Sequence, residues 1–474
     1  MTSKKSNNNL FTDLYSVGIC KKSSRPKSEK SCCYTGKAIV FFFLIFCSSY
    51  CIAKTSVKDF GAKGDGVSND YPALLAAAAY INKQGGGELF FPRGKYYIAE
   101  YHQPSSAVKD IVFSNCNNLS ISGDGAVIKV NGKFFRKADK VNGKYAYSNT
   151  YALTPFSFSN CKKVIIKNLE VNGGVSEMKR DAAVVETGGH LFLFQDCQDV
   201  TLQNVYVHHA QTDGVYIAGT RSARFNFSNL KSANNARQGM SIIQLLVGNF
   251  DNCQFINTGI TNGSYGLHAP GAGVDIEPRD GGISVRDIKF TNCIFQNNQG
   301  SQFVCTKPQA ATNILLDRCK LIASSGKSQY QLMLGASNVV IQNSTIDCGV
   351  GNIYPIANAN ITSTATIKNS TIKSAAAAVI SVAKANTSDK ITIDNCTIEY
   401  TGNTEVKSYF PYIRSAGMVF TNNKVIIPSQ FHKKKGPTSL IQNAQIASGN
   451  TFYSGGKIVK PVVSYQNTKT VKDR

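Results

Sequence analysis

The segments VIIKNLEV (164–171), VTLQNVYV (200–207) and ITIDNCTI (391–398) share the pattern that decides the fold of this chain. Each is a β-prone run that leads into Asn and continues with a small or apolar residue. Ten such segments occur, and we take the polar residue of each as its marker: Asn168, Asn204, Asn229, Asn252, Asn292, Arg318, Asn343, Asn369, Asn395 and Asn422. Seven of the nine intervals between successive markers are 23 to 27 residues long. A fixed period of short strands is typical of a solenoid, in which each repeat stacks on the next.

Composition supports a β-solenoid. The chain has 39 Gly and no Trp, and its body is rich in Asn, Ser, Thr, Val and Ile, which are residues of turns and strands. Helical periodicity is convincing only once, near the start of the body. Strands separated by polar turns indicate an all-β solenoid rather than a globular α/β domain.

The first 53 residues differ from the rest. Residues 1–37 are polar and basic, and the apolar run AIVFFFLIFC follows at Ala38–Cys47. With small residues at Cys51 and Ala53, this pattern indicates a signal peptide that is cut before Lys54. The run is shorter than the roughly 20 apolar residues of a membrane span. The long basic flank also suits an uncleaved N-terminal anchor, and both interpretations predict an exported protein that is secreted, periplasmic or at the cell surface.

We therefore predict a β-helix domain at 54–455, which begins with an opening module at 54–100, and a polar tail at 456–474. The formal net charge is +23, and removing residues 1–53 leaves 44 basic and 27 acidic residues, a net charge of +17. Such a charge attracts acidic polymers, although solubility alone would also explain it. Because no nucleic-acid-binding motif is present, an acidic polysaccharide is the expected partner and nucleic acid is not. Nothing in the sequence specifies an oligomeric state.

Nine of the fourteen Cys lie in the predicted body, and an odd number cannot all pair within the chain. Cys253, Cys293, Cys319 and Cys396 each follow a marker residue, at a position where other repeats have Ser, Leu or Val. This exchange predicts buried, stacked thiols that fill space. No CxxC or CxxH spacing occurs, so no metal site is predicted.

One amphipathic helix is predicted, over 72–83. Ser68, Asn69 and Asp70 offer N-cap oxygens, and the glycines at 85–87 end the helix. Strands are expected at Val57–Phe60, ELFFP (88–92) and KYYI (95–98), and a loop at 61–66. A helix before a β-solenoid covers the first coil, whose edge and apolar interior would otherwise be exposed.

This module resembles the start of the pectate-lyase-like superfamily, which includes rhamnogalacturonase-type and epimerase-type proteins. The resemblance rests on DFGAKGDG (59–66), GGG (85–87) and the P-x-G-x-Y pattern of PRGKY (92–96). The chain departs from the family at Tyr71-Pro72, where Asp-Thr is frequent. The resemblance implies a right-handed single-stranded parallel β-helix and a carbohydrate-active function, and we expect about ten or eleven coils in this chain. It does not define the reaction, because the superfamily includes hydrolases, lyases, epimerases and non-catalytic spikes.

Four segments are expected to stack as a functional face: GGHLFLF (188–194), TDGVYIA (212–218), RQGMSII (237–243) and GAGVDIEP (271–278). We expect their apolar residues, including Leu191 and Leu193 in the first, to face inward. The alternation of side chains along a strand then points four residues outward in one column, namely His190, Tyr216, Ser241 and Asp275. About eleven extra residues precede the first and fourth segments, and such long loops are expected to wall a groove.

Asp275 and Glu277 form the sharpest catalytic candidates. At i and i+2 on a strand their Cα atoms are about 6.6–6.8 Å apart on one face, and carboxyl groups about 6.5–9.5 Å apart suit inverting glycoside hydrolysis. Gln211-Thr212-Asp213-Gly214 resembles the Asn-Thr-Asp-Gly of polygalacturonases, which makes Asp213 either catalytic or a turn-capping residue. The Asp-Asp that this family needs one coil later is replaced here by Arg237-Gln238, and its His-Gly and Arg-Ile-Lys elements are missing.

Two other functions stay open. A polysaccharide lyase would use cations against a uronate carboxylate and a base for the C5 proton, here Arg237 with Tyr216 or His190. Epimerisation ranks lower because the Asp-Pro-His of mannuronan epimerases is absent. A non-catalytic protein could bind glycan on the same face. The expected substrate-binding residues are His190, Tyr216, Arg237, Gln238, Ser241, Arg279 and His209. No cofactor is predicted, and no motif supports calcium.

Overall fold

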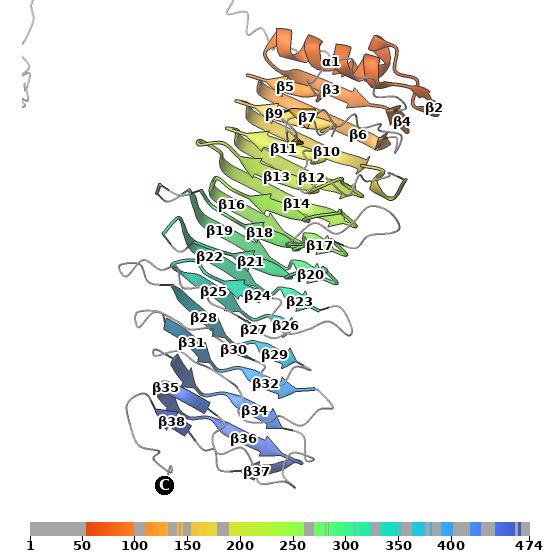
Figure 1. Cartoon of the computed structure of the whole chain (residues 1–474). Coiled ribbons are helices and arrows are strands. Elements are labelled where there is room, and N and C mark those ends of the chain that lie inside the picture. The colour runs from red at the N-terminus through yellow and green to blue at the C-terminus, as the bar shows by residue number, and fades with distance from the viewer. Residues whose placement is uncertain are drawn as a thin grey trace, which may run out of the picture. The chain divides into compact units, whose positions relative to one another are not determined.

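The computed structural model describes residues 54–98, 110–130, 140–141, 144–145, 153–177, 189–259, 270–279, 281–282, 284–307, 309–323, 332–348, 350–351, 363–374, 380–381, 390–401, 418–427, 441–459 and 463–465. In this part of the chain, successive parallel strands stack as the coils of a right-handed parallel β-helix (Figure 1). The fold class expected from the marker pattern and from the resemblance is confirmed.

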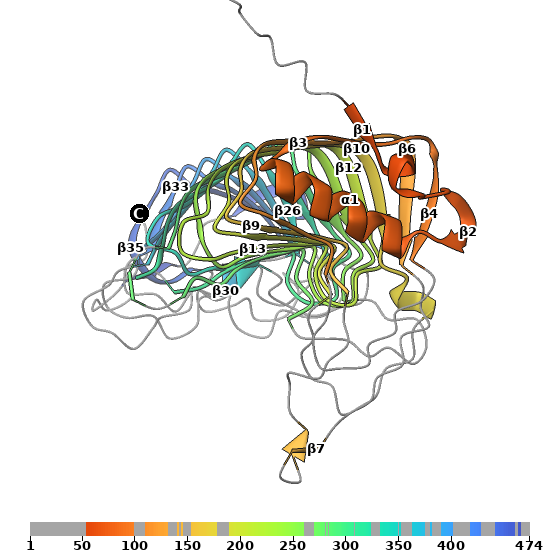
Figure 2. The ribbon, with the colours of Figure 1, turned by 90° about the horizontal axis from the view of Figure 1, so that it is seen from above.

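Each regular coil passes through three faces, and Figure 2 looks along the stack. In the coil of Tyr216, strand β12 (Gln198–His208) crosses the first two faces and changes direction at Asn204. The chain then turns a corner at 209–214, and β13 (Val215–Ala218) lies on the third face. The strands that cross two faces in this way are β6 (Asn117–Val130), β10 (Lys162–Asn172), β12 and β14 (Ala223–Ala233).

Elsewhere the first and second faces are built from separate strands. The first face has β1 (Lys54–Ser56), β3 (Gly87–Phe91), β16 (Leu245–Asp251), β19 (Val285–Thr291), β22 (Ala311–Asp317), β25 (Val339–Gln342), β28 (Thr364–Lys368), β31 (Lys390–Asp394), β33 (Met418–Thr421), β35 (Ile441–Ser448) and β38 (Val463–Tyr465). The second face has β2 (Asp65–Asn69), β4 (Gly94–Ile98), β17 (Gln254–Ile256), β20 (Ile294–Gln296), β23 (Lys320–Ile322), β26 (Thr345–Asp347), β29 (Thr371–Ser374), β32 (Thr397–Tyr400), β34 (Lys424–Ile427) and β36 (Thr451–Ser454).

The third face is an eight-stranded parallel sheet, and it carries the candidate site. Its strands are β5 (Val112–Ser114), β9 (Phe156–Ser159), β11 (Phe192–Gln195), β13, β15 (Met240–Ile242), β18 (Val274–Ile276), β21 (Phe303–Cys305) and β24 (Leu332–Leu334). The other short strands are β7 (Lys140–Val141), β8 (Lys144–Tyr145), β27 (Val350–Gly351), β30 (Ile380–Ser381) and β37 (Lys457–Val459).

The marker residues lie at a backbone turn between the first and second faces. All ten have a positive φ, between 50° and 56°. This left-handed conformation is strained for most residues and is best tolerated by Gly, Asn and Asp, which explains why Asn recurs there. On the first face, thirteen strands from β3 to β35 are joined by twelve parallel pairings. Ten of these strands belong to coils with a marker residue, and the other three are β3, β6 and β35. The unmarked coils of β6 and β35 use Gly125 (φ 64°) and Gly449 (φ 66°) at positive φ instead.

The marker side chains also bond to one another along the stack. Nδ2 of Asn204 donates to Oδ1 of Asn168 at 3.1 Å, Asn229 to Asn204 at 2.8 Å, and Asn252 to Asn229 at 2.7 Å. Arg318 replaces the amide with its guanidinium, whose Nε donates to Oδ1 of Asn292 at 3.0 Å. The repeat residue thus stabilises both its own turn and the contact with the next coil.

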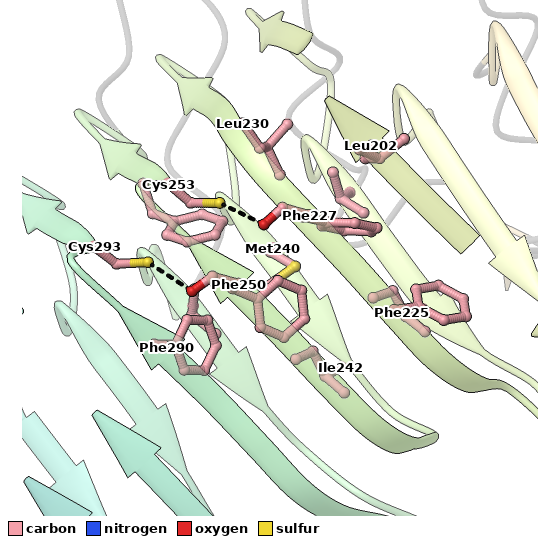
Figure 3. Close-up of a cluster of buried hydrophobic side chains, with 14 of the residues drawn as sticks. Leu202, Phe225, Phe227, Leu230, Met240, Ile242, Phe250, Cys253, Phe290 and Cys293 are labelled. Carbon is pink, nitrogen blue, oxygen red and sulfur yellow. Dashed lines mark hydrogen bonds between the residues drawn. The ribbon is translucent and has the colours of Figure 1, made fainter. Parts of the chain in front are cut away.

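The core between the faces consists of stacked apolar side chains. The cluster in Figure 3 includes two of the predicted thiols: Sγ of Cys253 donates to the carbonyl of Phe227 at 3.6 Å, and Sγ of Cys293 to that of Phe250 at 3.3 Å. All nine cysteines of the described residues are buried. The prediction of buried thiols at the repeat position is confirmed, and they pack as small apolar groups.

The opening module largely follows expectation. Helix α1 (Tyr71–Gln84) ends at Gly85 in the left-handed conformation and contacts β3 and β5 of the first coils. Three details of the prediction are wrong. Asp65–Asn69, expected as the end of a loop and as helix-capping residues, is strand β2. Val57–Phe60 is a 3-10 helix, η1, because the side chains of Ser56 and Asp59 form a capping box there. Asp70 makes no side-chain cap bond, because its carboxylate accepts the N–H groups of Lys63 (2.6 Å), Gly64 (3.2 Å) and Tyr97 (3.1 Å) instead.

Strands also extend beyond position 455, into the segment predicted as a polar tail. Strand β37 folds back on β36 as an antiparallel pair, and β38 pairs with β35 in the parallel sense. The exposed edge of the last coil offers unpaired backbone groups, which a following segment can use regardless of its polarity. No helix among the described residues is long and apolar enough to cross a bilayer.

Candidate active site

The candidate site lies where the chain enters β11, β13, β15 and β18 of the third face. Backbone bonds stack the corners of three coils: the N–H of Leu191 donates to the carbonyl of Asp213, and that of Gly214 to Gln238. On the strands themselves, Leu193 pairs with Tyr216, Tyr216 with Ser241, and Ser241 with Asp275. The expected column of Tyr216, Ser241 and Asp275 is therefore present.

The expected register of the first strand is wrong by one residue. Phe192 and Phe194 face the core, and Leu193 occupies the outward position next to Tyr216. Phe192 continues an aromatic stack from Phe156, with ring centroids 5.0 Å apart. Burying the side chains of Phe192 and Phe194 stabilises the coil more than burying that of Leu193 would. His190 consequently lies at the corner that precedes the strand rather than in the column.

Asp213 connects three coils. Its side chain is fully buried, and Oδ2 accepts the hydroxyl of Ser241 at 3.0 Å. The same oxygen lies 3.4 Å from Nδ1 of His190 on the preceding coil and 3.8 Å from Nη1 of Arg237 on the following one. Oδ1 has no hydrogen-bond partner among the described residues. The carboxyl group therefore holds an imidazole, a hydroxyl and a guanidinium at one corner.

Asp275 is the second buried acid of the site. It is 4% exposed, and its Oδ2 accepts the amide Nε2–H of Gln238 at 2.8 Å. Burial raises the pKa of Asp275 to about 7, because desolvation outweighs the bond from Gln238, and the nearby Glu277 adds to the increase. A carboxyl group with this pKa carries a proton in a large fraction of molecules at neutral pH.

His190 and Tyr216 form a stacked pair beside Asp213, with ring centroids 4.3 Å apart. Nδ1 of His190 is 3.0 Å from the hydroxyl of Thr212. Burial raises the pKa of the Tyr216 phenol, with Asp213 acting in the same direction and Arg237 and Arg279 opposing it. The phenol is therefore a proton donor at neutral pH, and the imidazole is held in one orientation.

Glu277 and Arg279 follow β18 and are exposed. Both influence Tyr216 electrostatically, and Glu277 also acts on Asp275, so they lie near the same groups. The structure thus separates the three predicted catalytic acids into two buried carboxyls, Asp213 and Asp275, and one exposed carboxylate, Glu277. Gln238 and Ser241 are buried and bond to these acids, a contact that side-chain alternation alone did not predict.

His209 belongs to a different cluster. Its Nδ1 is 2.5 Å from Nδ1 of His208, whose Nε2 is 3.2 Å from Oε1 of Glu170. The ring of His208 stacks on Tyr206, with centroids 4.3 Å apart. Among the described residues these contacts join His209 to β10 and β12, and no contact joins it to Asp213 or Asp275.

Asp110 is a site residue that the sequence did not reveal. Burial raises the pKa of its carboxyl, which is opposed by a bond from the N–H of Thr154 (2.9 Å) and by the nearby His190. His190 therefore lies close to both Asp110 and Asp213. A single sequence carries no signal for Asp110, because neither a motif nor a repeat position connects it with His190. The long loops expected to wall the groove fall mainly at 178–188 and 260–269, outside the described residues.

The described residues contain no group of three or more His, Cys, Asp or Glu side chains arranged to hold a metal ion. The arrangement instead offers acid and base groups next to two arginines. The right-handed parallel β-helix places this set of side chains on one face.

Comparison with known proteins gives the family. Residues 54–298 match the family described as rhamnogalacturonase A/epimerase, pectate lyase-like, and the chain belongs to that family. A polygalacturonase from Malus domestica is 25% identical over 289 residues, which cover 52% of this chain and 60% of that protein. Mannuronan C5-epimerase AlgE1 from Azotobacter vinelandii is 40% identical over 70 residues, which cover 15% of this chain and 5% of the epimerase. The chain thus spans less than two thirds of either relative.

Among solved structures, the A-module of mannuronan C-5 epimerase AlgE6 from Azotobacter vinelandii is similar with a TM-score of 0.57 and 17% identity. The similarity covers 88% of this chain and all of that module, 100% of its length. At this level of identity the similarity supports the fold and not the reaction.

Proposed function

We propose that this protein is an enzyme that hydrolyses glycosidic bonds in an anionic polysaccharide, with Asp275 as general acid and Glu277 as general base. The observation that carries the proposal is the pairing of a buried carboxyl, whose pKa is raised to about 7, with an exposed carboxylate two residues further along. Different environments that separate two nearby carboxyls into acid and base are the requirement of glycoside hydrolysis.

In this mechanism Asp275 donates its proton to the glycosidic oxygen as the bond to C1 breaks, and Glu277 takes a proton from the water that attacks C1. The net result is one sugar hydroxyl and one new reducing end. In this mechanism Asp213 orients the neighbouring His190 and Arg237, which its carboxyl contacts from the coils on either side.

An acidic substrate is supported by the net charge, by Arg237 and Arg279 beside the acids, and by relatives named as enzymes of polygalacturonan and mannuronan, which are polymers of uronic acids. A guanidinium suits recognition of a sugar carboxylate because it offers paired N–H donors. We also propose export, on the basis of residues 1–53. Cell fractionation should find the protein outside the cytoplasm, and N-terminal sequencing would distinguish cleavage before Lys54 from a retained anchor.

The test is digestion of purified polygalacturonate and alginate with the protein. We expect reducing ends without new absorbance from unsaturated uronate, and a loss of at least about a hundredfold in kcat for Asp275→Asn and Glu277→Gln. The matched control is Asp199→Asn, an acid-to-amide change in the surface pair of Asp199 with Arg224, which should retain full activity. Full activity of Asp275→Asn would exclude the assignment.

A second candidate is removal of the C5 proton from a uronate, as in a lyase. It is favoured by the stacked His190 and Tyr216, since Nδ1 of the imidazole faces Thr212 and Asp213 while the phenol is a proton donor. In that reaction His190 removes the C5 proton and Tyr216 protonates the leaving oxygen, which yields an unsaturated product. Ultraviolet absorbance during digestion, abolished by His190→Gln and retained by Glu277→Gln, would support this candidate. Binding of polysaccharide without any product would indicate a non-catalytic glycan-binding protein.

A further inference from the structure

Gln238 lies at the corner of the coil between Asp213 and Asp275, and its side chain has a single fixed orientation. It is fully buried, and its Oε1 accepts the backbone N–H of Ala272 at 3.2 Å. Because a backbone N–H can only donate, the amide oxygen must face Ala272 and the amide nitrogen must face Asp275. The bond of 2.8 Å from Nε2 to Oδ2 of Asp275 is thus a donation from Gln238.

The backbone next to Gln238 is packed closely against the following coil. A Cβ atom added to Gly239 would lie 2.3 Å from the carbonyl oxygen of Gly273, and one added to Gly273 would lie 2.5 Å from Nδ2 of Asn298. Such contacts are far below van der Waals distance, so Gly239 packs closely on the coil of Asp275, and Gly273 packs closely on the coil after that. The close approach at Gly239 places the corner of Gln238 directly beside the corner that precedes Asp275.

A protonated carboxyl has one oxygen that donates and one that only accepts. Since Oδ2 of Asp275 accepts from Gln238, the proton of the neutral acid resides on Oδ1. We infer that Gln238 is a positioning residue that selects Oδ1 of Asp275 as the proton-donating oxygen and determines the pH at which this acid loses its proton. The inference rests on the proposed function, in which Asp275 is the general acid.

The coil of Gln238 contacts the other buried acid, Asp213, through different side chains. Asp213 receives the hydroxyl of Ser241 and lies near the guanidinium of Arg237, both from the coil of Gln238. Ser241 therefore donates to Asp213 on the preceding coil, and Gln238 donates to Asp275 on the following coil. This separation provides a matched pair of variants, because Gln238 can be changed without removing a bond to Asp213, and Ser241 without removing a bond to Asp275.

The experiment uses the full chain and the pH profile of kcat/KM on the polysaccharide that it degrades. In Gln238→Met the donor is lost, so the pKa of Asp275 rises and the alkaline limb moves to higher pH, by about half a unit or more. We expect kcat to fall about tenfold, with KM changed less than about twofold, because the buried side chain does not contact substrate. Ser241→Ala should leave the alkaline limb in place.

A second variant and a second measurement keep the test decisive. Gln238→Glu retains an acceptor for Ala272 and also removes the amide donor, so it should shift the limb in the same direction. The second measurement is the free energy of unfolding as a function of pH, with Asp275→Asn in each background as the reference. The decline that Asp275 causes should extend to a higher pH in both variants, even if the reaction is not hydrolysis. If both variants fold and neither the activity limb nor the stability curve moves, the inference is wrong. If only the stability curve moves, the proposed function is wrong and the positioning role stands.

Discussion

Individual residues in this protein have unusual backbone or protonation states. Val247 is a β-branched residue with a φ of 68° in strand β16. At this turn position neighbouring coils have Asp199, Arg224, Asp287 and Asn313, also at positive φ. Side chains at positive φ cost roughly 1–2 kcal/mol, except for Gly, Asn and Asp. The side chain is also 37% exposed, so burial offers little compensation.

We expect Val247→Asn to stabilise the protein by about 1 kcal/mol, because Asn tolerates this conformation. The measurement is the midpoint of chemical or thermal unfolding. Val247→Ala keeps a Cβ at the same φ and serves as the control, with a smaller gain expected. Destabilisation by Asn would show that the valine side chain makes a favourable contact at this turn.

Asp275 should make stability depend on pH. Its folded pKa of about 7 is above the usual value of 3.8, so the folded protein binds more protons than the unfolded chain between these values. The stabilising contribution is complete below pH 3.8 and is lost as the pH rises through 7. Between pH 5 and pH 8 the wild type should lose about 2 to 3 kcal/mol relative to Asp275→Asn. Parallel unfolding curves for the two proteins across this range would contradict the assignment.

At the scale of elements, the loop before β2 depends on one side chain. The carboxylate of Asp70 is buried and accepts three backbone N–H groups, two from the loop and one from β4. In Asp70→Ala these donors lose their partner, which should cost about 2 to 4 kcal/mol and make the module sensitive to limited proteolysis. Asp70→Asn keeps one acceptor oxygen and should lose less. Asp59→Ala, at the exposed capping box, is the control and should cost about 1 kcal/mol or less.

The end of β12 should be sensitive to acid. Burial lowers the pKa of both His208 and His209. Glu170 opposes this shift at His208 and Glu177 opposes it at His209, while Lys231 lowers the pKa of His208 further. A histidine with a lowered folded pKa stabilises fully above its unfolded pKa of about 6.5 and loses that contribution as the pH falls. Replacing His208 with Gln should therefore flatten the loss of thermal stability between pH 7.5 and pH 5. An unchanged slope in this variant would indicate that other groups cause any acid sensitivity.

At the scale of the whole molecule, the positive charge should govern encounter with substrate. The formal net charge is +23, and +17 after removal of residues 1–53. Attraction between a basic protein and a polyanion is long-ranged and is screened by salt, with a Debye length of about 10 Å at 0.1 M. We expect KM on an acidic polysaccharide to rise at least about fivefold between 50 and 300 mM NaCl. On a neutral polysaccharide, binding should depend little on salt.

The fold could be read from the sequence because the period and the left-handed turn act locally. An Asn that favours positive φ, flanked by alternating β-branched residues, defines a coil without reference to the rest of the chain. The thiols at the repeat position were predictable for the same reason, since each coil places that position in the same buried environment. The corner residues 212–214 and 237–239 were predictable as neighbours because the register carries from one coil to the next.

What the tertiary structure alone decided concerns contacts without a repeat. Whether Phe192 or Leu193 faces the core depended on the aromatic stack with Phe156, and the role of Gln238 depended on the amide of Ala272 beside it. Asp110 entered the site only through the stacking of coils. The periodic sequence determines that there is a β-helix and which coils are neighbours, because these follow from local backbone preferences. Burial and hydrogen bonding between coils determine which acid holds a proton, because a pKa depends on the surroundings of a group in space.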